Sequence, residues 1–184
     1  DKAGIQLVPE NKAKKEKNER LAELLERLTA KNEKNLQNNK KAQEVLAKRE
    51  LKNETVQKFR LGYATENYND DEKYLLSEGF SHKEMLEAGV ITEYEKEKYR
   101  DKFRARIMCP FFSVSGLVLG FSGRSVDGGE PKYLNSTETP LFKKSEVLYG
   151  LNFAKENIRK NDFAIITEGQ FDVISLHDKG ITNT

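Results

Sequence analysis

The hydrophobic period of this chain changes near its middle, and that change constrains the fold more than any other feature. Between residues 19 and 49 apolar side chains recur at helical spacing, with four leucines from Leu21 to Leu28 at positions i, i+3, i+4 and i+7. We predict helix there, interrupted at Asn38-Asn39. Further along, the apolar runs 106–112 and 117–121 are separated by Ser-Gly, which is typical of a hairpin. The chain is expected to pass from a helical part into a sheet.

Shorter patterns fill the remaining sequence. Three short helices are predicted at 54–59, 71–78 and 81–88, and Ser81 with Glu84 forms a capping-box pattern at the start of the last one. The first 18 residues are rich in Lys, Glu and Asn and are expected to form a mobile lead-in or linker.

The C-terminal part of the chain alternates between strand-like and helical patterns. We predict a short strand at 132–134, a helix at 151–159, a buried strand at 163–167 and a helix at 171–179. Glu168 stands where the second strand gives way to the last helix, a position that faces the ligand side of an open sheet. These residues therefore predict the beginning of an α/β unit.

Charge is unevenly distributed along the chain. Residues 61–101 carry 5 basic and 11 acidic side chains, whereas residues 102–160 carry 10 basic and 5 acidic ones. The second segment is the one expected to contact phosphates, although a merely solvated surface explains the same counts. No apolar run approaches the roughly 18 residues of a membrane span. The single cysteine, Cys109, excludes an internal disulfide, and the separated His82 and His177 do not predict a zinc site.

The segment 165–174 has the spacing of a metal-dependent site. An apolar strand ends at Glu168, Gly169 permits a tight turn, and Asp172 follows in the first turn of the next helix. Two carboxylates placed in this way suit Mg²⁺, which takes oxygen ligands and keeps several waters. The alternative is that the acidic residues only stabilise the helix N-terminus.

Several motifs resemble one known family. The pattern E-G-x-x-D-V at 168–173 is similar to the first motif of the TOPRIM fold. Upstream, the segment 131–145 with Leu148-Tyr149-Gly150-Leu151, and the segments 104–110, 120–124 and 59–64, resemble the polymerase core of bacterial DNA primases of the DnaG family. The resemblance covers about residues 42–180. Cys109, Ser122 and Thr137 depart from the family pattern without removing a charge.

The resemblance implies an α+β fold, in which a helical and mixed β subdomain is followed by the first α/β unit of a TOPRIM domain. We accordingly divide the chain into a lead-in at 1–18, a mostly helical part at 19–101, a basic β-rich part at 102–160 and the start of TOPRIM at 161–184. The family's second metal motif, D-x-D, does not occur in these 184 residues, so the sequence is expected to end before it.

The resemblance also implies an activity, namely synthesis of short RNA primers on single-stranded DNA from ribonucleoside triphosphates, with Mg²⁺ or Mn²⁺. Glu168 matches the catalytic acidic residue, and Glu168 and Asp172 match the metal site. A basic ridge for template and nucleotides is matched by Arg106, Arg124, Lys132, Asn135 and Lys144. Zinc would belong to a separate N-terminal domain, a replicative helicase would bind a separate C-terminal domain, and the enzyme would be cytoplasmic.

Each role has an alternative. Arg106 and Arg124 are also suited to pairing with carboxylates on a half-exposed sheet, and the adjacent Lys143 and Lys144 cannot both face one cleft if that stretch is extended. For the chain as a whole, the alternatives are a non-catalytic module that binds single-stranded DNA, or another TOPRIM protein such as a topoisomerase or nuclease.

Overall fold

A computed structural model describes residues 12–184, and its first element is a long helix. Helix α1 (Lys12–Asn38) and helix α2 (Lys40–Ala47) meet at Asn39, whose Oδ1 accepts a hydrogen bond from the Ala42 backbone N–H at 2.9 Å. The predicted interruption is thus confirmed. The expected lead-in lies partly outside the described residues, and its described part, residues 12–18, is helical and continuous with the rest of α1. Lys, Glu and Ala are strong helix formers, and Lys17 pairs with Glu87 at 2.9 Å.

The centre of the fold is a four-stranded antiparallel sheet with strand order β1-β4-β5-β6. Its strands are β1 (Gly62–Ala64), β4 (Arg106–Phe112), β5 (Val118–Ser125) and β6 (Tyr133–Asn135). The predicted β4–β5 hairpin is confirmed. Pro110 is tolerated inside β4 because β1 pairs only with residues 106–108, so no strand within residues 12–184 pairs with Pro110 on that side.

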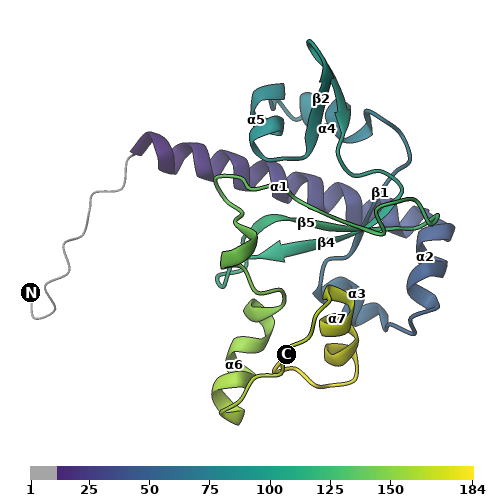
Figure 1. Ribbon diagram of the computed structural model, residues 1–184, viewed down its shortest axis with the longest axis vertical. Helices are drawn as coiled ribbons and strands as arrows, with labels where there is room; N and C mark the ends of the chain where they lie inside the picture. Colours follow the sequence, from purple (N-terminus) through teal and green to yellow (C-terminus); the bar gives the residue numbers. More distant parts are fainter. Residues whose placement is uncertain (1–11) are drawn as a thin grey trace, which may run out of the picture.

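Helices cover both faces of this sheet (Figure 1). Neighbouring residues of β4 point to opposite faces, so Met108 packs with the leucines of α1, whereas Ile107 packs with Ile174 of helix α7 (Gln170–Asp178). Phe59, which ends helix α3 (Asn53–Lys58), belongs to the second of these cores. The sheet is therefore a rigid platform with one core on each side.

A small acidic subdomain, residues 65–101, is inserted between β1 and β4. It contains helices α4 (Asp70–Ser77) and α5 (His82–Glu87) and a hairpin of strands β2 (Ile91–Glu95) and β3 (Lys98–Asp101). The capping box of Ser81 and Glu84 is confirmed. The hairpin was not predicted, because its outer part is so highly charged that no apolar alternation marks it.

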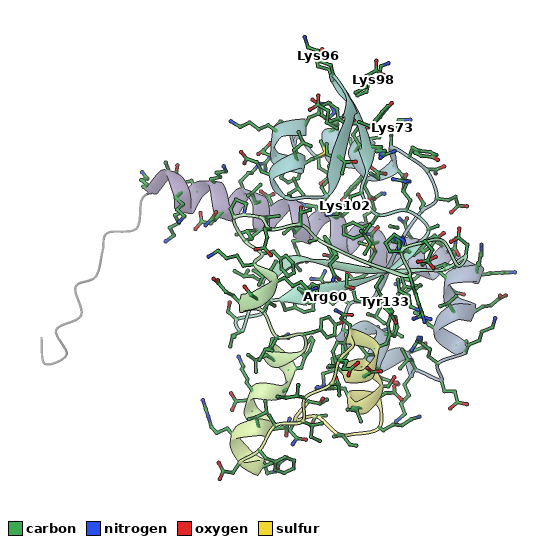
Figure 2. The ribbon with its side chains drawn as sticks, viewed as in Figure 1. Arg60, Lys73, Lys96, Lys98, Lys102 and Tyr133 are labelled. Atoms are coloured by element: carbon green, nitrogen blue, oxygen red, sulfur yellow. The ribbon has the colours of Figure 1, made fainter. Side chains whose placement is uncertain are left out.

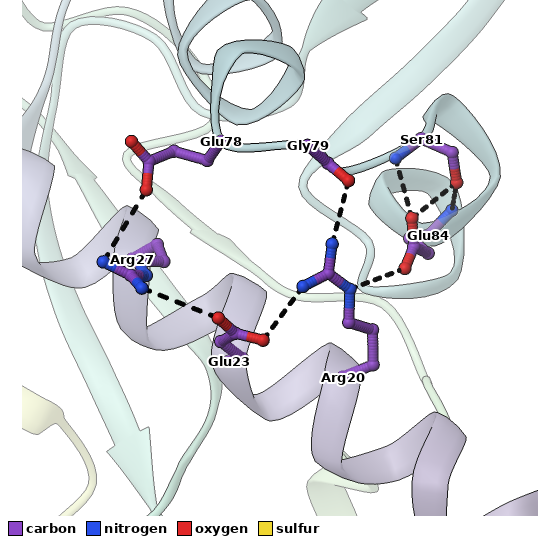
Figure 3. Close-up of polar contacts among 7 residues, drawn as sticks. All are labelled: Arg20, Glu23, Arg27, Glu78, Gly79, Ser81 and Glu84. Carbon is purple, nitrogen blue, oxygen red and sulfur yellow. Dashed lines mark hydrogen bonds and ion pairs between the residues drawn. The ribbon is translucent and has the colours of Figure 1, made fainter.

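Ion pairs fasten this subdomain to α1 (Figure 3). Arg20 donates to Glu84 at 3.1 Å and to the Gly79 carbonyl at 2.8 Å, and Arg27 lies 3.7 Å from Glu78. These contacts join residues 51 to 64 positions apart in the sequence, so the charged face of α1 is a docking surface for the acidic subdomain.

The C-terminal part consists of a 3₁₀ turn η1 (Lys144–Glu146), helix α6 (Leu151–Asn161) and helix α7. Both helices were predicted, but the buried strand at 163–167 is wrong: the segment forms no strand, and Phe163 and Ile166 are 57% and 89% exposed. A buried strand needs pairing partners and cover on both faces. Within residues 12–184, the segment bonds to Asn183, through the Ile165 N–H at 2.9 Å and the Phe163 carbonyl at 3.2 Å. In the same range, no helix is long and apolar enough to span a membrane.

Candidate functional site

A basic cleft lies between the end of α2 and the connection from β5 to β6. Arg124 of β5 and Lys132, which precedes β6, line a cavity of about 720 Å³. Lys48 and Arg49, at the end of α2, line the same cavity. We call these four side chains the basic cleft. Two of them were predicted from the sequence and the α2 pair was missed.

Aromatic rings hold two of these guanidinium groups in place. The Arg49 guanidinium lies 4.3 Å from the centroid of the Phe171 ring, and that of Arg124 lies 5.5 Å from the same ring. Arg124 also lies 5.2 Å from the Tyr133 ring and donates to the Tyr133 hydroxyl. Phe171 belongs to α7, so the first turn of that helix positions both guanidinium groups of the cleft.

The charges of the cleft are not neutralised inside the protein. Within residues 12–184, none of its four cations forms an ion pair with a carboxylate. The Nε of Arg124 is buried without a hydrogen-bond acceptor in the same range. One carboxylate, Glu130, lines the cavity and accepts from the Lys132 backbone N–H at 3.2 Å. Four cations facing one carboxylate leave a site suited to phosphate.

Asn135 and Arg106 lie close to the cleft but differ in burial and contacts. Asn135 pairs with Ser122 on the sheet face that also carries Arg124, and its Oδ1 is buried without a donor among the described residues. Arg106 is buried, and its Nη1 donates to the Gly123 carbonyl at 3.1 Å and the Lys132 carbonyl at 3.5 Å. Burial lowers the pKa of Arg106. These two hydrogen bonds hold the main chain at Lys132 against the sheet.

A second, smaller cavity of about 280 Å³ brings Glu168 together with Lys144. Glu168 is exposed, and Thr167 lines the same cavity with its Oγ1 buried and without a hydrogen-bond partner in residues 12–184. Lys143 instead pairs with Glu146 at 3.0 Å and lines a different cavity. The two adjacent lysines thus line different cavities, although Lys144 begins a 3₁₀ turn and the stretch is not extended as the sequence argument assumed.

Asp172 does not line the cavity of Glu168. Its Oδ2 accepts from the Gly169 backbone N–H at 3.1 Å, which is the helix-capping role expected of an acidic residue in a first turn. Among residues 12–184 no three side chains of metal-binding type are grouped for coordination. Two neighbouring carboxylates suit Mg²⁺ only as part of a donor set that phosphates and waters complete.

An exposed aromatic side chain marks a further feature that the sequence analysis missed. Tyr68, in the loop before α4, is 62% exposed, and the Arg104 guanidinium lies 4.8 Å from its ring centroid. Exposed rings and guanidinium planes are the groups on which unpaired bases stack. We call this pair the stacking platform. Two distant residues form it, so local sequence patterns did not reveal it, whereas Lys48-Arg49 was visible as a basic pair at a helix end.

Comparisons with known proteins agree with this architecture. Residues 30–155 match the family described as the DNA primase catalytic core, N-terminal domain. A DNA primase of Clostridium acetobutylicum is 45% identical over 150 residues, which are 81% of this chain and 25% of that protein. A DNA primase of Synechococcus elongatus is 44% identical over 135 residues, 72% of this chain and 20% of that protein. The chain thus spans about a quarter of the length of these curated relatives.

Solved structures are similar over nearly the whole chain. A crystal structure of the Aquifex aeolicus primase, with its zinc-binding and RNA polymerase domains, has a TM-score of 0.84 at 35% identity, covering 99% of this chain and 44% of that one. The RNA polymerase domain of Mycobacterium tuberculosis primase DnaG has a TM-score of 0.83 at 31% identity, covering 90% and 55%. A DnaG primase catalytic domain bound to single-stranded DNA has a TM-score of 0.82 at 30% identity, covering 94% and 55%.

Proposed function

The chain belongs to the DnaG family of bacterial DNA primases, whose catalytic core contributes the N-terminal domain seen here, and from this we propose that it holds single-stranded template DNA within an enzyme that synthesises RNA primers. The observation that carries the proposal is the basic cleft, whose four cations are unpaired within residues 12–184 and line one cavity. The family assignment disfavours the alternative of a TOPRIM topoisomerase or nuclease.

The cleft is suited to the sugar-phosphate backbone of the template or to the phosphates of ribonucleoside triphosphates. Arg124 and Arg49 are held against Phe171 with their planar groups preorganised for bidentate contacts, while Lys48 and Lys132 supply point charges. Asn135, on the same sheet face as Arg124, is a neutral hydrogen-bonding partner, and Arg106 positions the chain around Lys132. The complex of a similar DnaG primase catalytic domain with single-stranded DNA supports the proposal that this chain binds a template.

Catalysis is assigned to the smaller cavity. Glu168 is the proposed catalytic carboxylate and, with Asp172, a ligand of Mg²⁺ or Mn²⁺, while Lys144 in the same cavity is placed to contact a phosphate. A bound divalent cation would polarise phosphoryl oxygens and neutralise the charge that develops on them. Asp172 would have to exchange its capping bond to Gly169 for a metal contact or serve both.

Residues 161–184 are proposed as the first unit of a TOPRIM domain. The segment 163–167 has an apolar strand sequence but exposes Phe163 and Ile166, and Leu148 beside the Glu168 cavity is 68% exposed. Exposed apolar surface of this kind is normally covered in a complete fold. Further strands of a TOPRIM sheet would cover it and would bring the D-x-D carboxylates that complete the metal site.

The remaining assignments concern the whole enzyme. Zinc in a separate N-terminal domain and a replicative helicase on a separate C-terminal domain follow from the family resemblance, as does a cytoplasmic site of action. They are proposals for the full-length protein, of which this chain corresponds to about a quarter by comparison with its relatives.

The test is primer synthesis by a longer protein that contains this chain followed by a complete TOPRIM domain. It should make primers with Mg²⁺ and ribonucleotides, and Glu168→Gln should reduce the rate by at least about 100-fold, because a metal-bound charge supplies several kcal/mol of stabilisation. Glu146→Gln is the matched control, since Glu146 is an exposed carboxylate outside the Glu168 cavity. The 184-residue chain alone should make no primers, because its two carboxylates supply only part of a metal site. Primer synthesis by the chain alone, or full activity in Glu168→Gln, would contradict the assignment.

A second candidate is a module that grips single-stranded DNA without catalysis, and the unpaired cations of the cleft favour it for the chain in isolation. Weak binding to a short labelled oligonucleotide is expected, with an affinity that falls as salt rises because bound phosphates release counterions. Binding that is indifferent to salt would rule out phosphate contacts by the cleft.

A further inference from the structure

Asp101, the last residue of β3, connects the stacking platform to the body of the protein through both its main chain and its side chain. Its backbone N–H donates to the Tyr68 carbonyl at 2.7 Å, and its carbonyl accepts from Nη1 of Arg104 at 2.5 Å. One residue therefore bonds to both members of the platform. Its side chain is 1% exposed, so these contacts are made from a fixed position.

The Asp101 carboxylate caps helix α4. Its Oδ2 accepts from the Asp71 backbone N–H at 2.8 Å and its Oδ1 from the Glu72 N–H at 2.9 Å. The residue in the usual capping position, Asn69, makes no such bond; its amide instead donates to the Tyr99 carbonyl at 2.7 Å. Asp101 is thus the cap of a helix that is distant in sequence, and the Tyr68 loop runs directly into that helix.

We propose that Asp101 is a positioning residue for template binding: its ionised carboxylate holds the start of α4 and thereby orders the Tyr68–Arg104 platform that stacks an unpaired base. The inference rests on the proposed function of template binding. It assigns no contact with DNA to Asp101 itself, which is buried. Loss of one capping bond would loosen the loop from Tyr68 to Asp70 and would leave the basic cleft unchanged.

Protonation of Asp101 would weaken its capping bonds to helix α4. Burial, followed by the nearby charge of Asp71, raises the pKa of Asp101 to about 7. A protonated carboxyl group has one hydroxyl oxygen, which is a poor acceptor for a backbone N–H. The groups nearest the carboxylate are Asp70, Asp71 and Glu72 of α4. Further charged or titratable groups lie on the neighbouring elements: Lys31 of α1, which pairs with Asp70 and Asp71, His82 of α5, which contacts Glu72 at 2.7 Å, and Tyr68, Tyr99, Lys102 and Arg104 on either side of Asp101 in the chain.

Asp101→Asn imitates the protonated form in nearly the same shape. Affinity for a short labelled oligothymidylate is measured by anisotropy for the parent chain and for Asp101→Asn at about pH 8 and about pH 6. We expect about fivefold weaker binding for the variant at the higher pH, the size of a stacking contact, and less than about twofold difference at the lower pH. A loss of equal size at both pH values indicates a purely structural effect and overturns the proposal.

Background variants locate the effect. Asp101→Asn should weaken binding little further in Tyr68→Ala, because the platform is already lost, but should weaken it fully in Lys132→Ala, because the cleft is separate. Equal loss in both backgrounds would overturn the proposal. If Asp101→Asn fails to fold, the test compares the parent chain with Tyr68→Ala. The ratio of their affinities should be larger at about pH 8 than at about pH 6, and a ratio that does not change with pH overturns the proposal. If Lys132→Ala binds the oligonucleotide as tightly as the parent, that result counts against the proposed function itself, irrespective of the results for Asp101→Asn.

Discussion

The acidic subdomain and the basic cleft use charge in opposite ways. In the acidic subdomain, carboxylates pair with cations of α1, such as Glu84 with Arg20 at 3.1 Å and Asp71 with Lys31 at 2.6 Å. In the basic cleft, Arg124 and Lys132 form no ion pair within residues 12–184. Charge that is paired inside the protein joins secondary-structure elements, whereas unpaired charge beside a cavity is available to a ligand.

The other cations can also be classified by whether they pair with a carboxylate. Arg60 lies between Glu26 at 2.8 Å and Glu33 at 2.9 Å, and those two partners raise its pKa, so it belongs to the paired group. Lys98 pairs with Glu95 at 2.9 Å, and Figure 2 shows it with Lys96 at the tip of the β2–β3 hairpin, far from Tyr133 beside the cleft. A count of lysines along the sequence does not separate these cases, but the pairing does.

The largest expected effect is on the paired side of the comparison. Lys31→Ala should lower the free energy of unfolding by about 3 to 5 kcal/mol, because it leaves the buried Asp71 carboxylate without its partner. Lys34→Ala, an exposed position on the same helix, is the control and should change stability by less than about 0.5 kcal/mol. Urea denaturation measures both. Equal stabilities for the two variants would mean that the buried pairing is not structural.

The next expected effect is a pH dependence of the contribution that Asp101 makes to stability. The pKa of Asp101 is about 7 in the folded chain, whereas the ordinary pKa of an aspartate side chain is 3.8, so the folded state binds an extra proton between those pH values. The contribution of Asp101 to stability should therefore fall as pH rises from about 4 to about 7, by on the order of 2 to 3 kcal/mol after allowance for solvent screening. Asp70, whose pKa is lowered despite burial because Lys31 contacts it, acts in the opposite sense but is common to parent and variant.

The measurement is the unfolding free energy of the parent minus that of Asp101→Asn across this pH range. The difference should decline with rising pH and then level off above about pH 7.5. A difference that rises with pH would show that the two capping bonds outweigh burial and depress the pKa of Asp101.

The sequence predicted those features that depend on neighbours in the chain. The break at Asn39, the capping box at Ser81 and the β4–β5 hairpin are set by local hydrogen bonds and alternation, and all three were confirmed. The segment 163–167 failed because a buried strand depends on partners and cover that its own residues do not specify.

The site divides in the same way. Arg124 and Lys132 were found through a family motif, and the structure places them in one cavity. Tyr68 was missed because its significance arises only when Arg104 is brought beside it, whereas Arg49 stood in a visible basic pair and only its contact with Phe171 of α7 depends on the fold. The roles of Glu168 and Asp172 remain predictions, since the described residues contain no three-ligand cluster and place only Glu168 at the smaller cavity.

On the unpaired side, Lys132→Ala should weaken oligonucleotide binding by about 10-fold, or about 1 to 2 kcal/mol, and should reduce the slope of log affinity against log salt by about one. Stability should change by less than about 0.5 kcal/mol, because Lys132 is exposed. Lys98→Ala is the matched control, with the same change of charge at the hairpin tip and no expected loss of binding. If both variants bind equally well, net charge explains the interaction and the cleft does not.

The smallest expected effect concerns a solvent-exposed ion pair between the acidic subdomain and α1. Glu78 lies 3.7 Å from Arg27, but their side chains are 32% and 53% exposed, so solvent and salt screen the attraction. Glu78→Gln should lower the free energy of unfolding by no more than about 0.5 kcal/mol, and even that difference should shrink in high salt. The measurement is urea denaturation of parent and variant at low and high ionic strength. A loss of about 2 kcal/mol or more would place Glu78 with the buried Lys31 pair, and pairing at the surface would then be as structural as pairing in the core.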